Sequence, residues 1–164
     1  MNASSKPDLL TETNLRGRGF KLIAGIDEVG RGPIAGPVVA AAVILKEGFI
    51  SSDINDSKKI STSKRELLYH KIVRESCVGI GIGDVECIDT INILNATKYA
   101  MNRAFKELPK KPDVLLIDGN FEINSEILNI PIVKGDQKSL SIAAASIVAK
   151  VVRDRIMEKF SYVF

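Results

Sequence analysis

Apolar residues in this chain follow two patterns, short continuous runs and longer segments with helical spacing. The short runs are rich in β-branched residues and bounded by glycine, proline or polar residues, which is typical of strands. Five such runs span residues 21–27, 37–45, 78–85, 114–117 and 130–133. A Gly-Pro-rich segment between the first two predicts a turn there. Glycines alternate with apolar residues in the third run, which predicts a strand that another backbone approaches closely.

Three longer segments are expected to form helices, at 64–75, 88–108 and 139–160. Ser63 is expected to cap the first helix, with Glu66 completing a capping box. The second has apolar residues at helical spacing, among them Ile91 and Leu94, and two prolines stop it. The third is rich in alanine, with charged later turns. A brief helix over 8–15 is expected within a polar lead-in.

The element order is strand, strand, helix, strand, helix, strand, strand, helix. Paired strands followed by alternating elements predict an α/β fold with a mixed sheet covered by helices. A length of 164 residues corresponds to one domain. We place this domain at 20–164, after the polar lead-in at 1–19.

Composition excludes several classes of protein. The longest uncharged apolar-rich run, 36–45, is about half of what a membrane-spanning helix needs. The N-terminus lacks the apolar core of a secretory signal. Two cysteines, Cys77 and Cys87, are too few for a disulfide scaffold and fit no metal-binding spacing. We therefore expect reduced thiols, a cytoplasmic location and no membrane contact.

Four acidic residues lie at or just beyond the ends of predicted strands: Asp27 and Glu28, Asp118, and Asp136. Ligand sites in α/β sheets form at the carboxyl ends of strands. Carboxylates that meet there require a compensating cation, and an all-oxygen shell favours Mg2+ or Mn2+. The alternative is that these acids are solvated turn residues. Asp27 and Glu28 can share a site only if their strand bends or ends there, because neighbouring residues on a regular strand point to opposite faces.

The segment after these acids, Gly30-Arg31-Gly32, places flexible backbone and a phosphate-binding arginine beside the predicted metal site. A competing interpretation is a dinucleotide-binding fingerprint, because Gly30, Gly32 and Ala35 fit its spacing. That motif must open a helix. Here prolines and a β-branched run follow, which disfavours a nucleotide cofactor.

The formal net charge of +3 conceals an uneven distribution. Residues 56–74 and 134–164 are both basic, and the remainder of the chain is acidic. An acidic centre between basic segments suits a nuclease that binds metal at its core and phosphates around it. Taken singly, each basic segment is more often a solvated helix face. Aromatic residues make up only 5%, which argues against a broad base-stacking platform, and His70 is expected to be structural.

Five segments of this chain closely resemble the ribonuclease HII family, the type 2 ribonucleases H. They are GIDEVGRGPIAGPVVAAAVIL at 25–45, DSKKIS at 56–61, INILNAT at 91–97, LLIDGN at 115–120 and KGDQKSLSIAAASIVAKVVRDR at 134–155. The resemblance implies a ribonuclease H-like fold with a mixed five-stranded sheet whose first three strands are antiparallel.

The resemblance also implies the chemistry. The family uses Mg2+ or Mn2+, as two divalent ions, to cleave the RNA strand of RNA–DNA hybrids. It also cuts 5′ to a ribonucleotide embedded in duplex DNA, leaving a 3′-hydroxyl. The residues that match the family's catalytic and metal-binding acids are Asp27, Glu28, Asp118 and Asp136.

Substrate contacts are implied at six further positions. Gly30, Arg31 and Gly32 match the motif that senses the ribose 2′-hydroxyl, while Lys58, Ser146 and Lys150 match substrate-side positions. Asp154 resembles one member of a recurrent Arg-Asp pair that we interpret as structural. It is the rival to Asp136 as fourth ligand.

Family members continue for some tens of residues beyond the last predicted helix and carry there a tyrosine that packs against the nucleotide at the cleavage junction. We expect this chain to lack that C-terminal part. The alternative to an active, monomeric enzyme is therefore a weakly active or inactive domain that binds metal and nucleic acid. A less favoured third reading is a related phosphotransferase acting on DNA. Partner proteins are not predicted.

Overall fold

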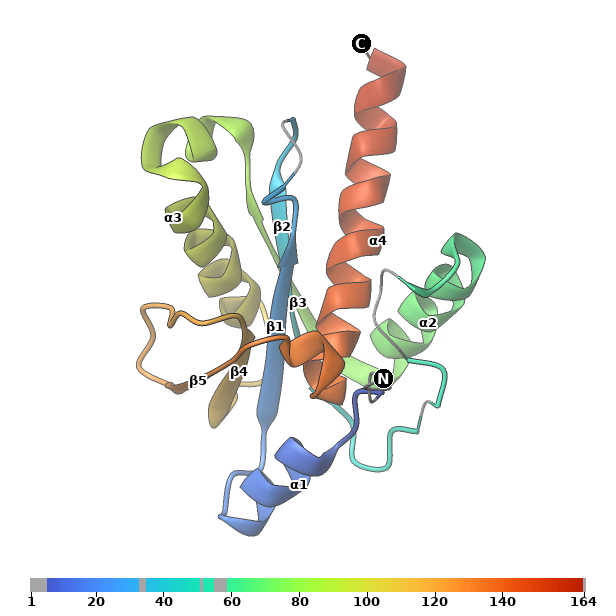
Figure 1. The fold of residues 1–164 in the computed structure, drawn as a ribbon, viewed down its shortest axis with the longest axis vertical. Helices are drawn as coiled ribbons and strands as arrows, with labels where there is room; N and C mark the ends of the chain where they lie inside the picture. Colours follow the sequence, from blue (N-terminus) through green and yellow to red (C-terminus); the bar gives the residue numbers. More distant parts are fainter. Residues whose placement is uncertain (1–5, 33–34, 51, 55–58, 164) are drawn as a thin grey trace, which may run out of the picture.

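The computed structural model describes residues 6–32, 35–50, 52–54 and 59–163, which form a sheet with helices on both faces (Figure 1). The strands are β1 (Ile23–Val29), β2 (Val38–Leu45), β3 (Ser76–Gly83), β4 (Val114–Asp118) and β5 (Leu128–Ile132). The helices are α1 (Leu10–Gly17), α2 (Thr62–Glu75), α3 (Val85–Lys106) and α4 (Leu140–Val163), with a short 3-10 turn, η2, at Gly135–Gln137.

The sheet has five strands in the order β3-β2-β1-β4-β5. β1 and β3 both run antiparallel to β2, whereas β4 is parallel to β1 and β5 is parallel to β4. This is the predicted mixed sheet whose first three strands are antiparallel, so the fold-class prediction is confirmed.

The two faces of the sheet pack against different helices, with α3 on one side and α4 and α2 on the other (Figure 1). Ala40 and Ala42 of β2 join the cluster formed with α3, and Ala41 and Val43 join the cluster formed with α4. Every residue of β2 is buried. A strand covered on both faces requires an unbroken apolar run, which explains the sequence VVAAAVIL.

Glycines allow helices to contact the sheet directly. A Cβ atom on Gly79 or Gly81 would overlap a backbone carbonyl oxygen of α3, at Ala104 or Ala100 respectively. The prediction that another backbone approaches β3 is confirmed. Gly25 of β1 plays the same part on the opposite face, where a Cβ atom would overlap the backbone of Ser141 in α4.

Two details of the predicted helices are wrong. The cap of α2 is Ser61, whose Oγ accepts a hydrogen bond from the Lys64 N–H at 3.3 Å, so the helix begins before the predicted Ser63. α3 begins at Val85 and is broken at Asn92, which has a φ of 70° and whose side chain caps the following turn through the Asn95 N–H. The break interrupts the helical period, so Ile91 and Leu94 are exposed rather than packed in the core.

Part of the predicted lead-in packs against the sheet domain. Within α1, Leu15 and Glu12 are buried. One Glu12 carboxylate oxygen accepts hydrogen bonds from the Ser139 hydroxyl at 2.6 Å, and from the N–H and hydroxyl of Ser141 at 3.0 and 2.7 Å. A carboxylate at the first turn of α4 satisfies one of its free N–H groups, that of Ser141, and complements the helix dipole. The first helix therefore fixes the start of the last.

In the part of the chain that the structure describes, no helix is both long enough and apolar enough to cross a membrane. Cys77 and Cys87 are both free thiols, as the cysteine count predicted.

Candidate metal centre

Two parallel strands at the centre of the sheet bring acidic residues to the same edge. Asp27 lies near the end of β1, and Asp118 is the last residue of β4, the strand beside it. Asp136 follows β5 on the η2 turn. The Asp136 N–H donates to Asp118 Oδ1 at 3.3 Å, which fixes the turn against the end of β4.

The carboxylates of Asp27, Glu28 and Asp118 form a tight group. One oxygen from each lies within 4.8 Å of the others. All three line a cavity of about 340 Å³ together with Asp136, Ser146 and Lys150. Six residues that the resemblance assigns to the site therefore line one cavity. They come from β1, β4, η2 and α4.

The neighbours Asp27 and Glu28 share this site close to the end of β1. The Glu28 N–H donates to Asp27 Oδ1 at 2.8 Å, which holds the Asp27 side chain along its own backbone. β1 ends at Val29, and Gly30 follows with a φ of 108°. Only glycine adopts this conformation without strain, so Gly30 allows the strand to end one residue after Glu28.

Burial and like charge raise the pKa values of two of these acids. The pKa of Asp27 lies well above its ordinary value, first because the carboxyl group is buried and then because Asp118 and Glu28 lie nearby. Burial and the charge of Asp118 also raise the pKa of Glu28, while Arg31 partly opposes them. The Arg31 guanidinium is 3.8 Å from Glu28 Oε1. The positive charge of Arg31 does not offset the combined negative charge of the three carboxylates.

The residues present fit a divalent cation. Glu28 Oε2 is buried and has no hydrogen-bond partner among the described residues, so it is an unused ligand atom within the acidic group. Carboxylate oxygens are the ligands that Mg2+ and Mn2+ prefer. A bound cation would satisfy this oxygen and offset the repulsion that raises the two pKa values.

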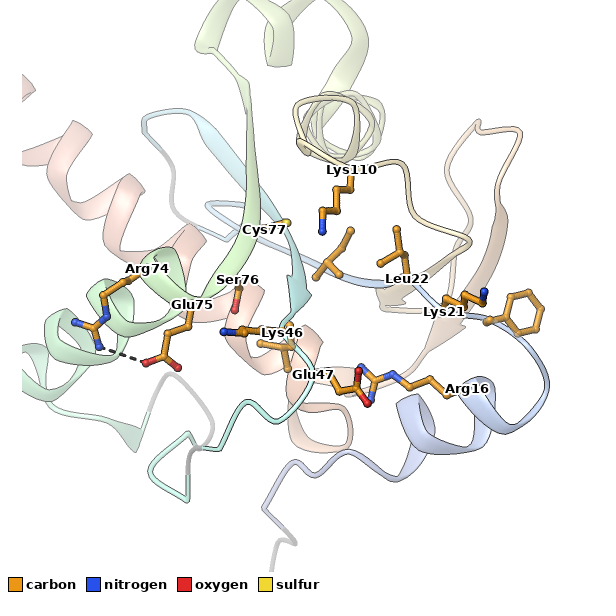
Figure 2. Close-up of a pocket in the computed structure, with 13 residues that line it drawn as sticks. Arg16, Lys21, Leu22, Lys46, Glu47, Arg74, Glu75, Ser76, Cys77 and Lys110 are labelled. Carbon is orange, nitrogen blue, oxygen red and sulfur yellow. Dashed lines mark hydrogen bonds and ion pairs between the residues drawn. The ribbon is translucent and has the colours of Figure 1, made fainter.

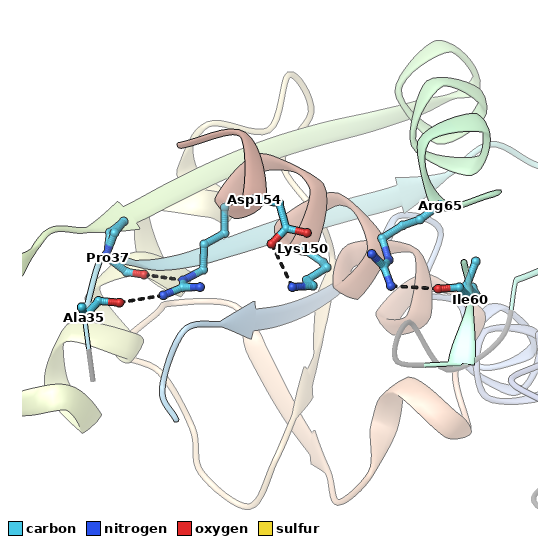
Figure 3. A network of polar contacts seen from close by, with 7 residues as sticks. Ala35, Pro37, Ile60, Arg65, Lys150 and Asp154 are labelled. Atoms are coloured by element: carbon cyan, nitrogen blue, oxygen red, sulfur yellow. Dashed lines mark hydrogen bonds and ion pairs between the residues drawn. The ribbon is translucent and has the colours of Figure 1, made fainter. Parts of the chain in front are cut away.

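Asp154 occupies a different place from Asp136. Its carboxylate accepts a hydrogen bond from Lys150 Nζ at 2.8 Å (Figure 3). It does not line the cavity beside the acids, whereas Asp136 does. Asp136 therefore lies beside the group formed by Asp27, Glu28 and Asp118, although it is not part of that group, whereas Asp154 contacts Lys150.

The segment that contains Gly30, Arg31 and Gly32 is anchored to α4 by a residue that we did not single out from the sequence. Arg153 is 6% exposed, and its guanidinium donates to the carbonyl oxygens of Pro37 and Ala35 at 2.9 and 3.0 Å (Figure 3). A Cβ atom on Gly30 would lie 2.6 Å from Arg153 Nε. The sequence signals for this contact are a basic residue on the Ala-rich helix and the recurrent Arg-Asp pair within the motif VVRDR.

The remaining predicted substrate residues are placed in part. Ser146 is buried, and its position on α4 lines the cavity beside the acids. Lys58 lies outside the described residues. Ile60 lies near the end of the same DSKKIS segment. Its carbonyl oxygen accepts a hydrogen bond from the Arg65 guanidinium of α2 at 2.9 Å, which ties the segment to the helix (Figure 3).

Comparison with known proteins identifies the family of the chain. The family model described as Ribonuclease HII matches residues 24–162. The chain belongs to the ribonuclease HII family. Ribonuclease HII of Listeria monocytogenes serovar 1/2a is 51% identical over 150 residues, which are 91% of this chain and 57% of the relative. The chain thus spans a little over half the length of that relative.

Solved structures share the fold. Ribonuclease H2 from Pyrococcus horikoshii OT3 superposes with a TM-score of 0.73 at 29% identity, covering 87% of this chain and 76% of the other. The ribonuclease HII of Archaeoglobus fulgidus, solved in complex with PCNA, gives 0.72 at 28% identity, covering 88% and 78%. These neighbours confirm the ribonuclease H-like fold.

Proposed function

We propose that this chain carries the catalytic centre of an endoribonuclease that cleaves the RNA strand of RNA–DNA hybrids. The same centre would cut duplex DNA on the 5′ side of an embedded ribonucleotide and leave a 3′-hydroxyl. The observation that carries the proposal is the convergence of Asp27, Glu28 and Asp118 within 4.8 Å, in a chain that belongs to the ribonuclease HII family.

The cofactor of this reaction would be Mg2+ or Mn2+. Asp27 and Asp118 would be the central ligands, with Glu28 and Asp136 completing two sites. Two divalent cations held there would supply an activated water and stabilise the negative charge that develops on the leaving oxygen. The residues of the chain would position the scissile phosphate, and none has to act as a nucleophile.

Recognition of the ribonucleotide would fall to Gly30, Arg31 and Gly32. A contact with the 2′-hydroxyl distinguishes RNA from DNA at a single position. Arg153 supports this role because it fixes the backbone that follows the motif. Lys150 and Ser146 line the cavity beside the acids, where they would face the substrate phosphate. Lys58 is proposed as a substrate contact on sequence grounds alone.

The proposal is tested with a labelled DNA duplex that contains one ribonucleotide, beside an all-DNA duplex, in the presence of Mg2+. We expect a single cut 5′ to the ribonucleotide, which Asp118→Asn abolishes. Glu126→Gln is the matched control, because it removes an exposed carboxylate outside the cavity and should retain cleavage. Binding without cleavage would instead support a metal- and nucleic-acid-binding domain, and cutting of the all-DNA duplex would contradict both readings.

A further inference from the structure

A second cavity, whose lining is drawn in Figure 2, lies where β1 and β3 begin and not at the end of the sheet that carries the acidic residues. Its volume is about 690 Å³, twice that of the cavity beside the acids. It opens where β1 begins, β2 ends and β3 begins, and Leu22, Leu45 and Ser76 mark these three points. Asp27 lies toward the other end of β1, so the two cavities are separate sites.

The lining of this cavity combines an apolar floor with a basic rim. Leu22, Ile44 and Cys77 contribute to the floor. Five basic and two acidic residues surround it, a net charge of +3, which equals the net charge of the entire chain. The basic residues are Arg16, Lys21, Lys46, Arg74 and Lys110. A small anion with an apolar body would satisfy both parts of the lining at once.

Polar groups that lack partners mark where the charged end of such a ligand would bind. Lys110 reaches the cavity from the connection between α3 and β4, and Lys46 reaches it from the end of β2 (Figure 2). Neither has an ion pair with the described residues, whereas Arg74 lies 3.3 Å from Glu75. The Ser76 hydroxyl oxygen is buried and has no hydrogen-bond partner within the described part of the chain. Two ammonium groups and a hydroxyl are typical donors to phosphate.

We propose that this cavity binds an organic phosphate of nucleotide size. Its phosphate would lie between Lys46 and Lys110, within reach of the Ser76 hydroxyl, and its flat or aliphatic body would pack on Leu22, Ile44 and Cys77. The volume falls within the range of about 300–1,000 Å³ that small-molecule sites occupy. Ribonuclease chemistry at the acids requires nothing from this end of the sheet, so the proposal does not rest on the proposed function.

The first test is calorimetric titration with AMP, and separately with adenosine and with inorganic phosphate. We expect AMP to bind at least tenfold more tightly than either part alone. The double variant Lys46→Ala/Lys110→Ala should weaken AMP binding by about tenfold or more, the scale of one charge-assisted hydrogen bond. Lys111→Ala/Lys159→Ala removes the same charge outside the cavity and should leave binding unchanged. Equal weakening by both double variants, or equal affinities for AMP and phosphate, would overturn the proposal.

The second test uses the two thiols and requires no substitution. Cys77 lines this cavity, whereas Cys87 lines a different one. Saturating AMP should slow the alkylation of Cys77 by N-ethylmaleimide by about fivefold or more, an occupancy effect that follows from ligand mass action. The alkylation rate of Cys87 should not change. No protection of Cys77, or equal protection of both thiols, would contradict binding at this cavity.

Discussion

Arg153 Nε donates a hydrogen bond to the Pro37 carbonyl oxygen at 2.9 Å, across 116 positions of sequence. The same guanidinium also donates to Ala35 at 3.0 Å. The first turn of α4 lies directly after η2, which carries Asp136. One helix therefore positions both the backbone that follows Gly30-Arg31-Gly32 and one edge of the acidic site.

Replacement of Arg153 by Met should disturb this segment without affecting the acids. It leaves two carbonyl oxygens without their donor, so we expect a loss of about 2–3 kcal/mol in the free energy of unfolding. Mn2+ affinity should stay within twofold of wild type, while cleavage beside a ribonucleotide falls mainly through a higher KM.

Denaturant unfolding, Mn2+ calorimetry and steady-state cleavage measure these three effects. Arg153→Lys should recover part of the stability, since one carbonyl can still be reached. Arg155→Met on the same helix is the control: its pair with Glu66 is partly exposed, so we expect a cost of about 1 kcal/mol or less. An equal cost for Arg153→Met and Arg155→Met would contradict the anchoring role.

Asp27→Asn should stabilise the protein in the absence of divalent metal. Because the pKa of Asp27 is higher in the folded state than in the unfolded state, the folded state binds more protons. The free energy of unfolding therefore falls as pH rises from about 4, the ordinary Asp value, toward the raised pKa. Asn keeps the oxygen that accepts the Glu28 N–H but carries no charge.

Thermal unfolding in EDTA between pH 4 and 8 measures this effect. We expect a higher melting temperature for Asp27→Asn at pH 7 and a shallower decline with pH than in wild type. Added Mn2+ should then raise the melting temperature of wild type only. A wild-type melting temperature equal to or above that of Asp27→Asn in EDTA would argue that the carboxylate is not destabilising.

Asp136 and Asp154 should differ in their effect on metal binding. Asp136 lines the acidic cavity, whereas Asp154 accepts the Lys150 ammonium group. We expect Asp136→Asn to weaken Mn2+ binding by about tenfold or more, and Asp154→Asn to change it by less than twofold. Calorimetry with Mn2+ compares the two, and the reverse order of effects would make Asp154 the ligand.

Gly81→Ala should destabilise the fold because a methyl group there overlaps the Ala100 carbonyl oxygen of α3. Overpacking of this kind costs about 1–3 kcal/mol. Gly17→Ala is the control, since nothing lies within 4 Å of a Cβ atom there and alanine favours helix. Urea unfolding of both variants checks the prediction, and an unchanged midpoint for Gly81→Ala would show that α3 can shift freely.

Patterns formed by residues that are close together in the sequence, such as continuous apolar runs, predicted the strands of the fold well. The apolar run of β2 and the short run of β4 ending at Asp118 are both correct, because burial on both faces of a central strand leaves a direct trace in composition. Because the apolar runs mark where β1 and β4 end, they also show that Asp27 and Asp118 lie at strand ends. Parallel pairing of β1 with β4 then brings Asp27 and Asp118 to one edge.

Contacts between distant segments were not predictable in this way. The buried Glu12 binds Ser139 and Ser141 more than 120 positions away, and nothing in the polar sequence around Glu12 marks it as buried. Arg153 looks like one more basic residue of a helix until its carbonyl partners are known. The helix break at Asn92 depends on a left-handed backbone that asparagine tolerates but does not require.

The central claim is that Asp27, Glu28, Asp118 and Asp136 form a divalent metal site. Anomalous diffraction from crystals soaked in Mn2+ tests it most directly. We predict a Mn2+ peak about 2.0–2.6 Å from carboxylate oxygens of both Asp27 and Asp118, lost in crystals of Asp118→Asn. A map with no anomalous peak among these four residues at saturating Mn2+, or with peaks only elsewhere, would contradict the account.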